Sequence, residues 1–428
     1  MSAAVAIDGA APFRPIGHTW RGWQGRRIRT FVFLLAILLV NYTLFRPSPV
    51  DIAFATAFAL TVFCRQQITP TAFAFFVLIF IWHISMMSAS LRFADDEEVV
   101  YQMAKISYAI SIGLCACLVA VHWTSAQLHC FLAVWILSTT IASTLGILGF
   151  SLGIPDFTWD GRAKGLLDDP NMYGAFLLPA LFGCIYFVHL GRRRSLYLGC
   201  LAWITLGLML SFSRVAIVAY LLLGAILVFI LNRRALLRVV LYAAAGGVVV
   251  AVVGVCAALF IEGFDDKLLD RFTFAKDYDL GEQGRLARYA GSIAFILEHP
   301  RGMGLLQYEK IFPEPIHNIW ISSFMNFGWA AGFAWSMLVV FSITISIRNY
   351  RRTGDLICLV LLFGWIGILL CALLHEAERW RPLWLITGIL WGVNVRNWPP
   401  RAPAPVPPSY SAAVAKTPAP GRPALASA

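Results

Sequence analysis

A single histidine, His317, stands between a proline-broken loop and a long apolar run in the stretch PEPIHNIWISSFMNFGWAAG. Pro313 and Pro315 stiffen the chain before it, and Asn318 follows it directly. A polar side chain at a helix entrance commonly satisfies an unpaired backbone group. An imidazole also titrates near neutral pH and is able to act as a general base. For an isolated histidine capping is the more common role, so its neighbours in space must decide between the two.

Three arginines, Arg214, Arg285 and Arg288, have positions suited to binding an anion. Arg214 lies between two apolar runs in LMLSFSRVAIVAYLLL, where a charge is costly unless it pairs, reaches the interface or lines a polar cavity. Arg285 and Arg288 are three residues apart and share one helix face. The planar guanidinium fork fits phosphate oxygens. The alternatives are an interfacial position for Arg214, and ion pairs with local acids such as Asp279 or Glu282 for the other two.

The composition indicates whether the chain is a soluble or a membrane protein. Of the 428 residues, 59% are hydrophobic and 13% are charged, and the mean hydropathy is +0.72. Soluble domains carry about 25% charged residues, so the chain is an integral membrane protein. The net charge of +11 is dispersed in short clusters between apolar segments. This dispersion is typical of a topology signal and not of a nucleic-acid-binding surface.

Apolar runs of roughly 17 to 25 residues span a bilayer as helices. We predict an all-α, polytopic transmembrane bundle of about 12 helices, with apolar runs near 30–45, 51–64, 70–90, 99–121, 129–151, 171–190, 195–212, 214–231, 238–261, 317–347, 355–374 and 382–397. A long loop, 262–316, carries a short amphipathic helix in GRLARYAGSIAFIL at 284–297.

Lysine and arginine in the short loops predict that both termini are cytoplasmic. Residues 1–29 form a basic, uncleaved N-terminal tail, and the transmembrane domain extends over 30–398. Residues 399–428 are rich in proline and alanine and are predicted to be a disordered cytoplasmic tail. This orientation places His317 and the three arginines together at the outer face. His375, in HEAERWR on the same side, is expected to belong to an exposed ion-pair cluster.

A histidine and several arginines at one membrane face suit a transfer from a lipid diphosphate donor to a hydroxyl. The arginines would hold the diphosphate, and the histidine would accept the hydroxyl proton. The sequence has no G-x-x-x-x-G-K-[ST] phosphate loop, no dinucleotide fingerprint and no H-E-x-x-H pair. All nine cysteines lie in or beside apolar runs, which favours small membrane-core residues over a disulfide framework or zinc site. No nucleotide, metal or other cofactor is expected.

Four short segments within residues 165–332 follow one another in a familiar order. They are GLLDDPNMYG at 165–174, SFSR at 211–214, GR at 284–285 with HPRGMG at 299–304, and HN at 317–318 followed nine residues later by Gly328. Their order and spacing resemble the O-antigen ligase superfamily of membrane glycosyltransferases. That superfamily includes lipopolysaccharide O-antigen ligases and polymerases of O-units or exopolysaccharides.

The resemblance implies a GT-C-like helical fold in the bacterial inner membrane, with the large loop 262–316 and the active site in the periplasm. It implies that His317 is the general base that activates or orients the acceptor hydroxyl. Arg214 and Arg285 would bind the undecaprenyl diphosphate of the donor, with Arg288 as a further contact. Supporting residues would be Asp169, Asn171 and Asn318. The reaction would invert the anomeric configuration and need neither a metal nor a nucleotide.

Two acceptors stay open at this point. A ligase would join the glycan to lipid A core, and a polymerase would join it to another lipid-linked glycan. The chain reads WAAG after Gly328, where the ligase pattern continues with threonines, so the polymerase alternative is kept. A third alternative is a secondary transporter that binds an anionic substrate at Arg214. It ranks below the enzymes because transporters of this kind contain repeated halves with broken helices, and no repeat is visible.

Overall fold

The computed structural model describes residues 20–43, 48–63, 68–232, 284–312 and 314–398, together with scattered residues between 237 and 259. Several expectations lie outside these residues: both ends of the chain at 1–19 and 399–428, much of the apolar run 238–261, and the part of the long loop at 262–283.

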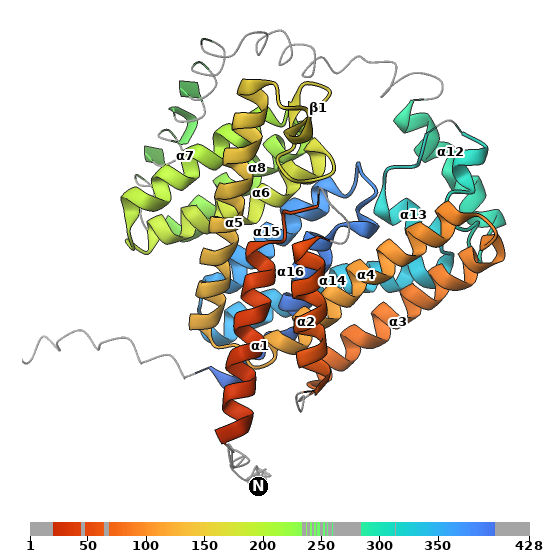
Figure 1. Ribbon diagram of the computed structural model, residues 1–428, viewed down its shortest axis with the longest axis horizontal. Helices are drawn as coiled ribbons and strands as arrows, with labels where there is room; N and C mark the ends of the chain where they lie inside the picture. The colour runs from red at the N-terminus through yellow and green to blue at the C-terminus, as the bar shows by residue number, and fades with distance from the viewer. Residues whose placement is uncertain are drawn as a thin grey trace, which may run out of the picture.

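The described chain is mostly helical, and its helices pack as one bundle (Figure 1). The first half contains α1 (Trp20–Leu38), α2 (Pro49–Phe63), α3 (Pro70–Ser90), η1 (Leu91–Phe93), α4 (Glu97–Ala120), α5 (Ser125–Leu152), η2 (Pro155–Phe157), α6 (Pro170–His189) and α7 (Arg194–Leu210). The second half contains α8 (Arg214–Asn232), α12 (Arg285–Glu298), η3 (Tyr308–Lys310), α13 (Ile319–Met325), α14 (Trp329–Thr353), α15 (Ile357–Cys371), η4 (Ala377–Arg379), α16 (Arg381–Gly392) and η5 (Val395–Asn397).

Six of the described helices are long and apolar enough to cross a membrane: α3 with η1, α4, α5, α6, α8 and α14. Three shorter helices, α2, α7 and α15, are also apolar. The predicted helical fold is therefore confirmed, with several helices able to cross a membrane. The count of about 12 spans stays a prediction. Five cysteines are buried within these helices, namely Cys115, Cys117, Cys184, Cys358 and Cys371.

Three local features differ from the predicted elements. The first helix begins at Trp20, so most of the N-terminal arginines belong to it and do not precede it. The run 317–347 is not one helix: α13 ends at Met325, and α14 starts after Gly328, whose φ of 91° is left-handed. The fold is also not purely α, because β1 (Thr158–Trp159) pairs with β2 (Arg162–Ala163). Asp160 and Gly161 have φ of 53° and 63°, as a two-residue hairpin turn requires.

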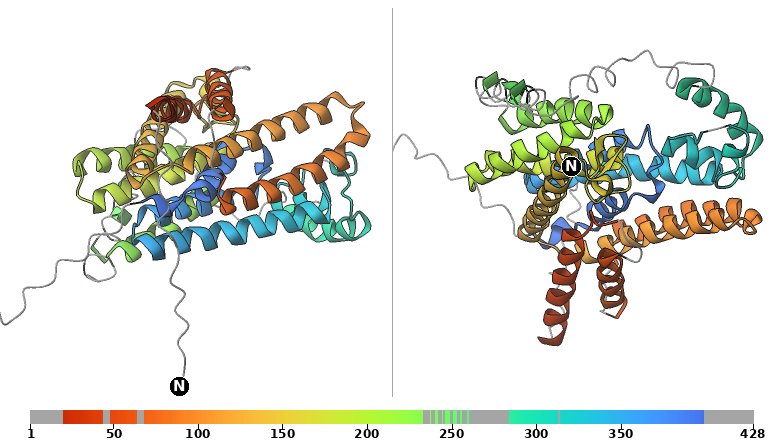
Figure 2. Two further views of the ribbon diagram at one scale, coloured as in Figure 1. Left: turned by 90° about the horizontal axis from the view of Figure 1, so that it is seen from below. Right: turned by 45° about the horizontal axis from the view of Figure 1, so that its top comes forward.

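The site depends on contacts between helices that are distant in sequence. The end of α3 and the start of α4 lie beside the segment that follows α12 (Figures 1 and 2). Arg92 donates to the carbonyl of Gly302, and Lys310 Nζ lies 3.6 Å from Asp96 Oδ2. Among the six long apolar helices, α6 is the most deeply buried, since 83% of its apolar stretch lies inside the bundle. These contacts bring the ends of several helices close to one another.

Candidate active site

A cavity of about 1540 Å³ lies where these helices meet. It is lined by α2, α4, α8 and α12, by the segments around the starts of α6 and α13, and by the connection between α15 and α16. The predicted site residues in its wall are Asp169, Asn171, Arg214, Arg285 and His317. Arg288 and Asn318 are not among the lining residues. Folding thus brings together side chains from four separate segments of the sequence: the start of α6, the start of α8, the start of α12 and the loop before α13.

Hydrogen bonds to the backbone around His317 hold this residue in position at the cavity. Its φ of 50° is left-handed, a conformation that costs a non-glycine residue about 1–3 kcal/mol unless its surroundings impose it. The hydroxyl of Tyr289 lies 3.1 Å from the His317 carbonyl and 3.0 Å from that of Leu373. Asn318 caps α13, because its Oδ1 accepts from the amides of Trp320 at 2.9 Å and Ile321 at 3.2 Å. The capping role that His317 alone suggested belongs to its neighbour, which leaves the imidazole facing the cavity.

The surroundings of His317 keep the ring neutral. Burial lowers its pKa to about 4, and the charges of Arg285, Arg288 and Arg379 act in the same direction. At neutral pH the imidazole therefore carries a lone pair that is able to accept a proton.

Arg214 is the first residue of α8, and the SFSR segment before it is a tight turn. Phe212 has φ of 49°, and the Ser213 amide donates to Ser211 Oγ at 3.2 Å. Gly174 of α6 faces this turn. A Cβ there would lie 3.0 Å from that of Ser213, so the glycine lets α6 approach closely. The DPN and SFSR motifs are therefore two sides of one contact, which fixes the start of α8.

Arg162, in β2, is a site residue that the sequence reading did not single out. Its Nε donates to the carbonyl of Ser211 at 2.8 Å and its Nη2 to Asn171 Oδ1 at 2.8 Å. Asp169 caps α6 by accepting from the amides of Asn171 at 2.7 Å and Met172 at 2.9 Å. The Asp-Gly hairpin was the available signal, because it predicts a strand that turns this arginine back toward the DPN segment.

The two arginines of α12 have different surroundings. Arg285 opens the helix and lines the cavity. Arg288 is 3% exposed; its Nη2 lies 2.9 Å from Glu314 Oε2, and its Nη1 donates to the carbonyl of Pro315 at 2.9 Å. The structure therefore places Arg288 against the loop that leads into His317, and the predicted diphosphate contact at this residue has no support from its position.

The glycines of the HPRGMG segment serve packing. Gly302, with φ of 84°, would bring a Cβ to 2.5 Å from the carbonyl oxygen of Asn326. The amide of Met303 donates to the carbonyl of Met325 at 2.9 Å, and that of Trp329 donates to Pro300 at 2.9 Å. The segment thus docks on the break between α13 and α14, which explains why Gly328 stands at a fixed distance from His317.

His375 corrects one expectation. It lines the cavity and is half-buried, whereas the sequence favoured an exposed ion-pair cluster. Its ring lies 6.4 Å from that of His317, centroid to centroid, and stacks on Trp380 at 5.9 Å. The ion pair itself is present, since Arg379 Nη2 lies 2.5 Å from Glu376 Oε2. Only the tertiary structure reveals a second imidazole beside the first.

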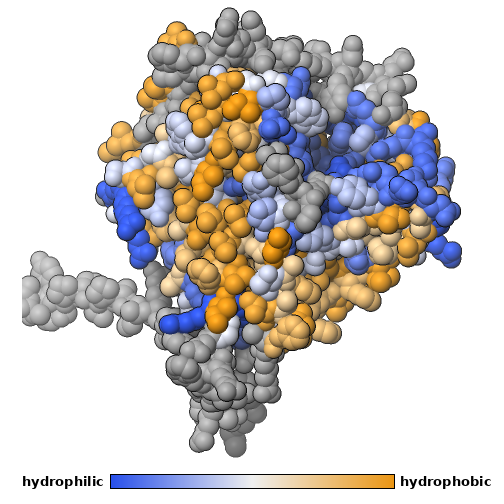
Figure 3. All heavy atoms as spheres, viewed as in Figure 1, coloured by the Kyte–Doolittle hydropathy of each residue, from blue (hydrophilic) through white to orange (hydrophobic). Residues whose placement is uncertain are grey.

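The cavity combines an excess of positive charge with an apolar wall. Its basic side chains are Lys105, Arg162, Arg214, Arg285, Arg379 and Arg381, and its acidic ones are Asp51, Asp168, Asp169 and Glu376. On α8, Val218 and Leu222 follow Arg214 at intervals of four residues, line the same cavity and are 53% and 56% exposed. Figure 3 shows hydrophilic residues gathered on the α12 side of the molecule and hydrophobic ones over the neighbouring helices. A ligand with an anionic head and an apolar chain matches this pattern.

Residues 198–336 match the family model described as O-antigen ligase, a region that includes the SFSR turn, α12 and His317. No curated protein matches the chain.

Proposed function

We propose, from the premise that this chain belongs to the O-antigen ligase superfamily, that it transfers a glycan from an undecaprenyl-diphosphate-linked donor to an acceptor hydroxyl. The reaction takes place at the periplasmic face of a bacterial inner membrane and builds cell-surface polysaccharide. The preferred acceptor is lipid A core, and the alternative acceptor is a second lipid-linked glycan, which would make the enzyme a polymerase.

One observation carries the proposal. A neutral imidazole, two arginines from different helices and an apolar strip of α8 all line one cavity. The diphosphate contacts Arg214 and Arg285, and the first isoprene units extend along Val218 and Leu222. Guanidinium groups stabilise the charge that develops on a departing diphosphate, and an apolar strip lets the lipid remain in the membrane while it reacts.

The chemical step follows from this placement. The acceptor oxygen attacks the anomeric carbon of the donor on the face opposite the diphosphate, and His317 takes the hydroxyl proton. A new carbon–oxygen bond forms while the bond to the diphosphate breaks, and both electrons of the broken bond leave with the diphosphate. Single displacement inverts the anomeric configuration. This chain's own residues supply the base and the charge stabilisation, so the step uses no metal or nucleotide.

The remaining predicted residues act on these groups indirectly. Arg288 and Asn318 hold the two sides of the His317 segment through Pro315 and through the start of α13. Asp169 and Asn171 anchor α6 and Arg162, which in turn contacts the turn before Arg214. They are positioning residues.

The test uses purified protein, a lipid-linked glycan donor and each acceptor separately. We expect kcat/KM to fall by about 10²–10⁴ in His317→Ala and by about 10²–10³ in Arg214→Ala and in Arg285→Ala. Arg301→Ala is the matched control, because this exposed arginine of the same region does not line the cavity. It should retain wild-type activity.

Product analysis separates the alternatives. A single glycan added to lipid A core identifies a ligase, and a ladder formed from the donor alone identifies a polymerase. Wild-type transfer by a well-folded His317→Ala protein would refute the catalytic role of this residue.

A further inference from the structure

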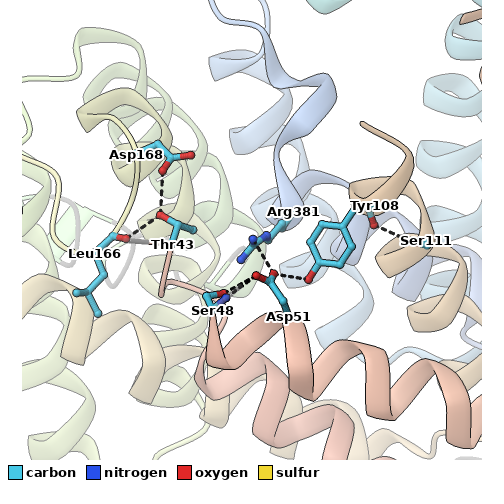
Figure 4. Close-up of polar contacts among 8 residues, drawn as sticks. All are labelled: Thr43, Ser48, Asp51, Tyr108, Ser111, Leu166, Asp168 and Arg381. Carbon is cyan, nitrogen blue, oxygen red and sulfur yellow. Dashed lines mark hydrogen bonds and ion pairs between the residues drawn. The ribbon is translucent and has the colours of Figure 1, made fainter. Parts of the chain in front are cut away.

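A polar cluster on α2, α4 and α16 faces the same cavity but has no role in the steps above (Figure 4). Asp51 is its centre. Its Oδ2 accepts from the amide of Ser48 at 2.7 Å and from Ser48 Oγ at 2.9 Å. Its Oδ1 accepts from the hydroxyl of Tyr108 at 2.7 Å and lies 2.8 Å from Arg381 Nη2. Three helices thus hold a carboxylate, a phenol and a guanidinium in fixed positions.

A second set of polar groups faces this cluster across the cavity. Thr43 Oγ1 lies 2.8 Å from the carbonyl oxygen of Leu166 and 3.2 Å from Asp168 Oδ1. In Figure 4, Thr43 and Asp168 come from one side, and Asp51 with Arg381 comes from the other. Thr43, Asp168, Asp51 and Arg381 all line the cavity between them.

The balance of charge here differs from that at the donor end of the cavity, which is the end that contains Arg214 and Arg285. Lys105 and Arg381 are matched by Asp51 and Asp168 within this part of the wall. A diphosphate placed here would meet two carboxylates, and such like-charge contacts are costly. A sugar ring meets a better partner, because its hydroxyls both donate and accept, and the wall offers carboxylate and hydroxyl acceptors beside guanidinium and ammonium donors.

Aromatic rings complete the match with a sugar. Tyr101, Tyr108 and Trp380 line the same cavity, and Lys105 Nζ lies 5.0 Å from the centroid of the Tyr101 ring. The C–H faces of a sugar pack against such rings, while its hydroxyl edge contacts the polar groups. The cavity wall therefore offers a complementary surface to each of the two kinds that an uncharged pyranose presents: aromatic rings for its C–H faces and polar groups for its hydroxyls.

Given the transfer function proposed above, we infer that Asp51, Tyr108 and Arg381 form the acceptor subsite and bind an uncharged, hydroxyl-bearing sugar of the acceptor glycan. The cluster adjoins the catalytic histidine: Arg381 starts α16 directly after the connection that carries His375, and the His375 ring lies 6.4 Å from that of His317. A sugar bound here presents its free hydroxyl toward His317, and the donor diphosphate occupies the Arg214 and Arg285 end.

The kinetic test compares Asp51→Asn and Tyr108→Phe with wild-type protein, and varies donor and acceptor glycolipid separately. Loss of a charge-assisted contact should raise the acceptor KM of Asp51→Asn about tenfold or more and leave the donor KM within about twofold. Tyr108→Phe keeps the Asp51–Arg381 ion pair and should raise the acceptor KM about threefold.

Ser138→Ala controls for a merely structural effect. Ser138 also joins distant segments: its Oγ donates to the Leu38 carbonyl at 2.8 Å and accepts from Asn41 Nδ2 at 3.0 Å. Ser138 does not line the cavity. It should change neither KM. An unchanged acceptor KM in Asp51→Asn, or an equal rise of both KM values, overturns the inference.

A binding measurement keeps the subsite testable even if no transfer occurs. The probe is the core oligosaccharide released by mild acid from the producing strain's own lipid A, titrated by calorimetry before and after removal of its phosphates. Wild-type protein should bind both forms equally, and Asp51→Asn should bind both about tenfold more weakly. Binding that requires the phosphates, or that Asp51→Asn leaves unchanged, contradicts the inference. Transfer failure with normal binding contradicts only the proposed function.

Discussion

The two imidazoles of the cavity are kept neutral by burial and by nearby positive charge. Burial lowers the pKa of His375 to about 3, with further lowering from Arg285, His317 and Arg162. His317, at about 4, has Arg285 among the causes of its shift as well. A base of this kind is weak in the empty enzyme. A bound diphosphate would offset the arginine charges and so raise the basicity of His317 where it is needed.

The neutral state of His317 predicts how transfer depends on pH. Activity requires neutral His317, so it should be lost as pH falls through the pKa of this group. The acid limb of kcat/KM reports the free enzyme and should lie near the pKa of about 4, whereas the limb of kcat reports the substrate complex and should lie at higher pH. His375→Gln should keep both limbs. Coincident limbs, or a kcat limb at lower pH, would show that the diphosphate does not tune this base.

At the scale of elements, close contact between α4 and α16 sets the acceptor side of the cavity. A Cβ at Gly388 would lie 2.0 Å from the carbonyl oxygen of Gly113, and one at Gly392 would lie 2.2 Å from that of Cys117. Small residues four apart let membrane helices approach closely, since apolar burial alone does not draw helices together in lipid. Tyr108 and Arg381 belong to these two helices. Their geometry therefore depends on glycines that lie away from the chemistry.

We predict that Gly388→Ala destabilises the protein by about 1–3 kcal/mol, the usual cost of overpacking a close contact. The helices must separate to admit the methyl group, so the acceptor KM should rise as well. Gly199→Ala in α7 is the matched control, because a Cβ there has no atom within 4 Å. Thermal unfolding in detergent measures both variants. Equal midpoints for the two would contradict the role of this crossing.

At the scale of the whole molecule, the proposed reaction requires one defined orientation in the membrane. The arginine-rich turn after α6 contains Arg192 and Arg193, whereas His317, Arg285 and the long loop are expected on the other side. A lipid donor reaches its arginines from within the bilayer only if the α8 strip is continuous with the lipid phase.

This orientation predicts the behaviour of reporter fusions. Alkaline phosphatase is active only outside the cytoplasm, so a fusion after Glu282 should be active and one after Arg193 should be inactive. The pair controls for expression, since both fusions follow the same N-terminal helices. The reverse pattern would put the cavity on the cytoplasmic side and exclude a periplasmic reaction.

The membrane class, the helical fold and five of the residues in the cavity wall could be predicted from the amino-acid sequence. These properties could be predicted because they depend on composition and on short motifs, and both involve residues that are close together in the sequence. His317 and Arg214 could be identified because each stands beside an apolar run, and Arg285 because the Gly284-Arg285 pair resembles the family's pattern.

The side chains that lie opposite those residues could not be predicted, because they depend on how the chain folds. Arg162 reaches the turn before α8 through a hairpin, His375 meets His317 through the connection after α15, and Arg288 turns to Glu314. The Asp51 cluster joins α2, α4 and α16, whose residues carry no common motif. Such contacts depend on how closely helices cross and on which faces they bury. The packing of segments that are distant in sequence sets the distance between the helices and the faces that they bury, so these contacts could not be predicted from any single stretch of the sequence.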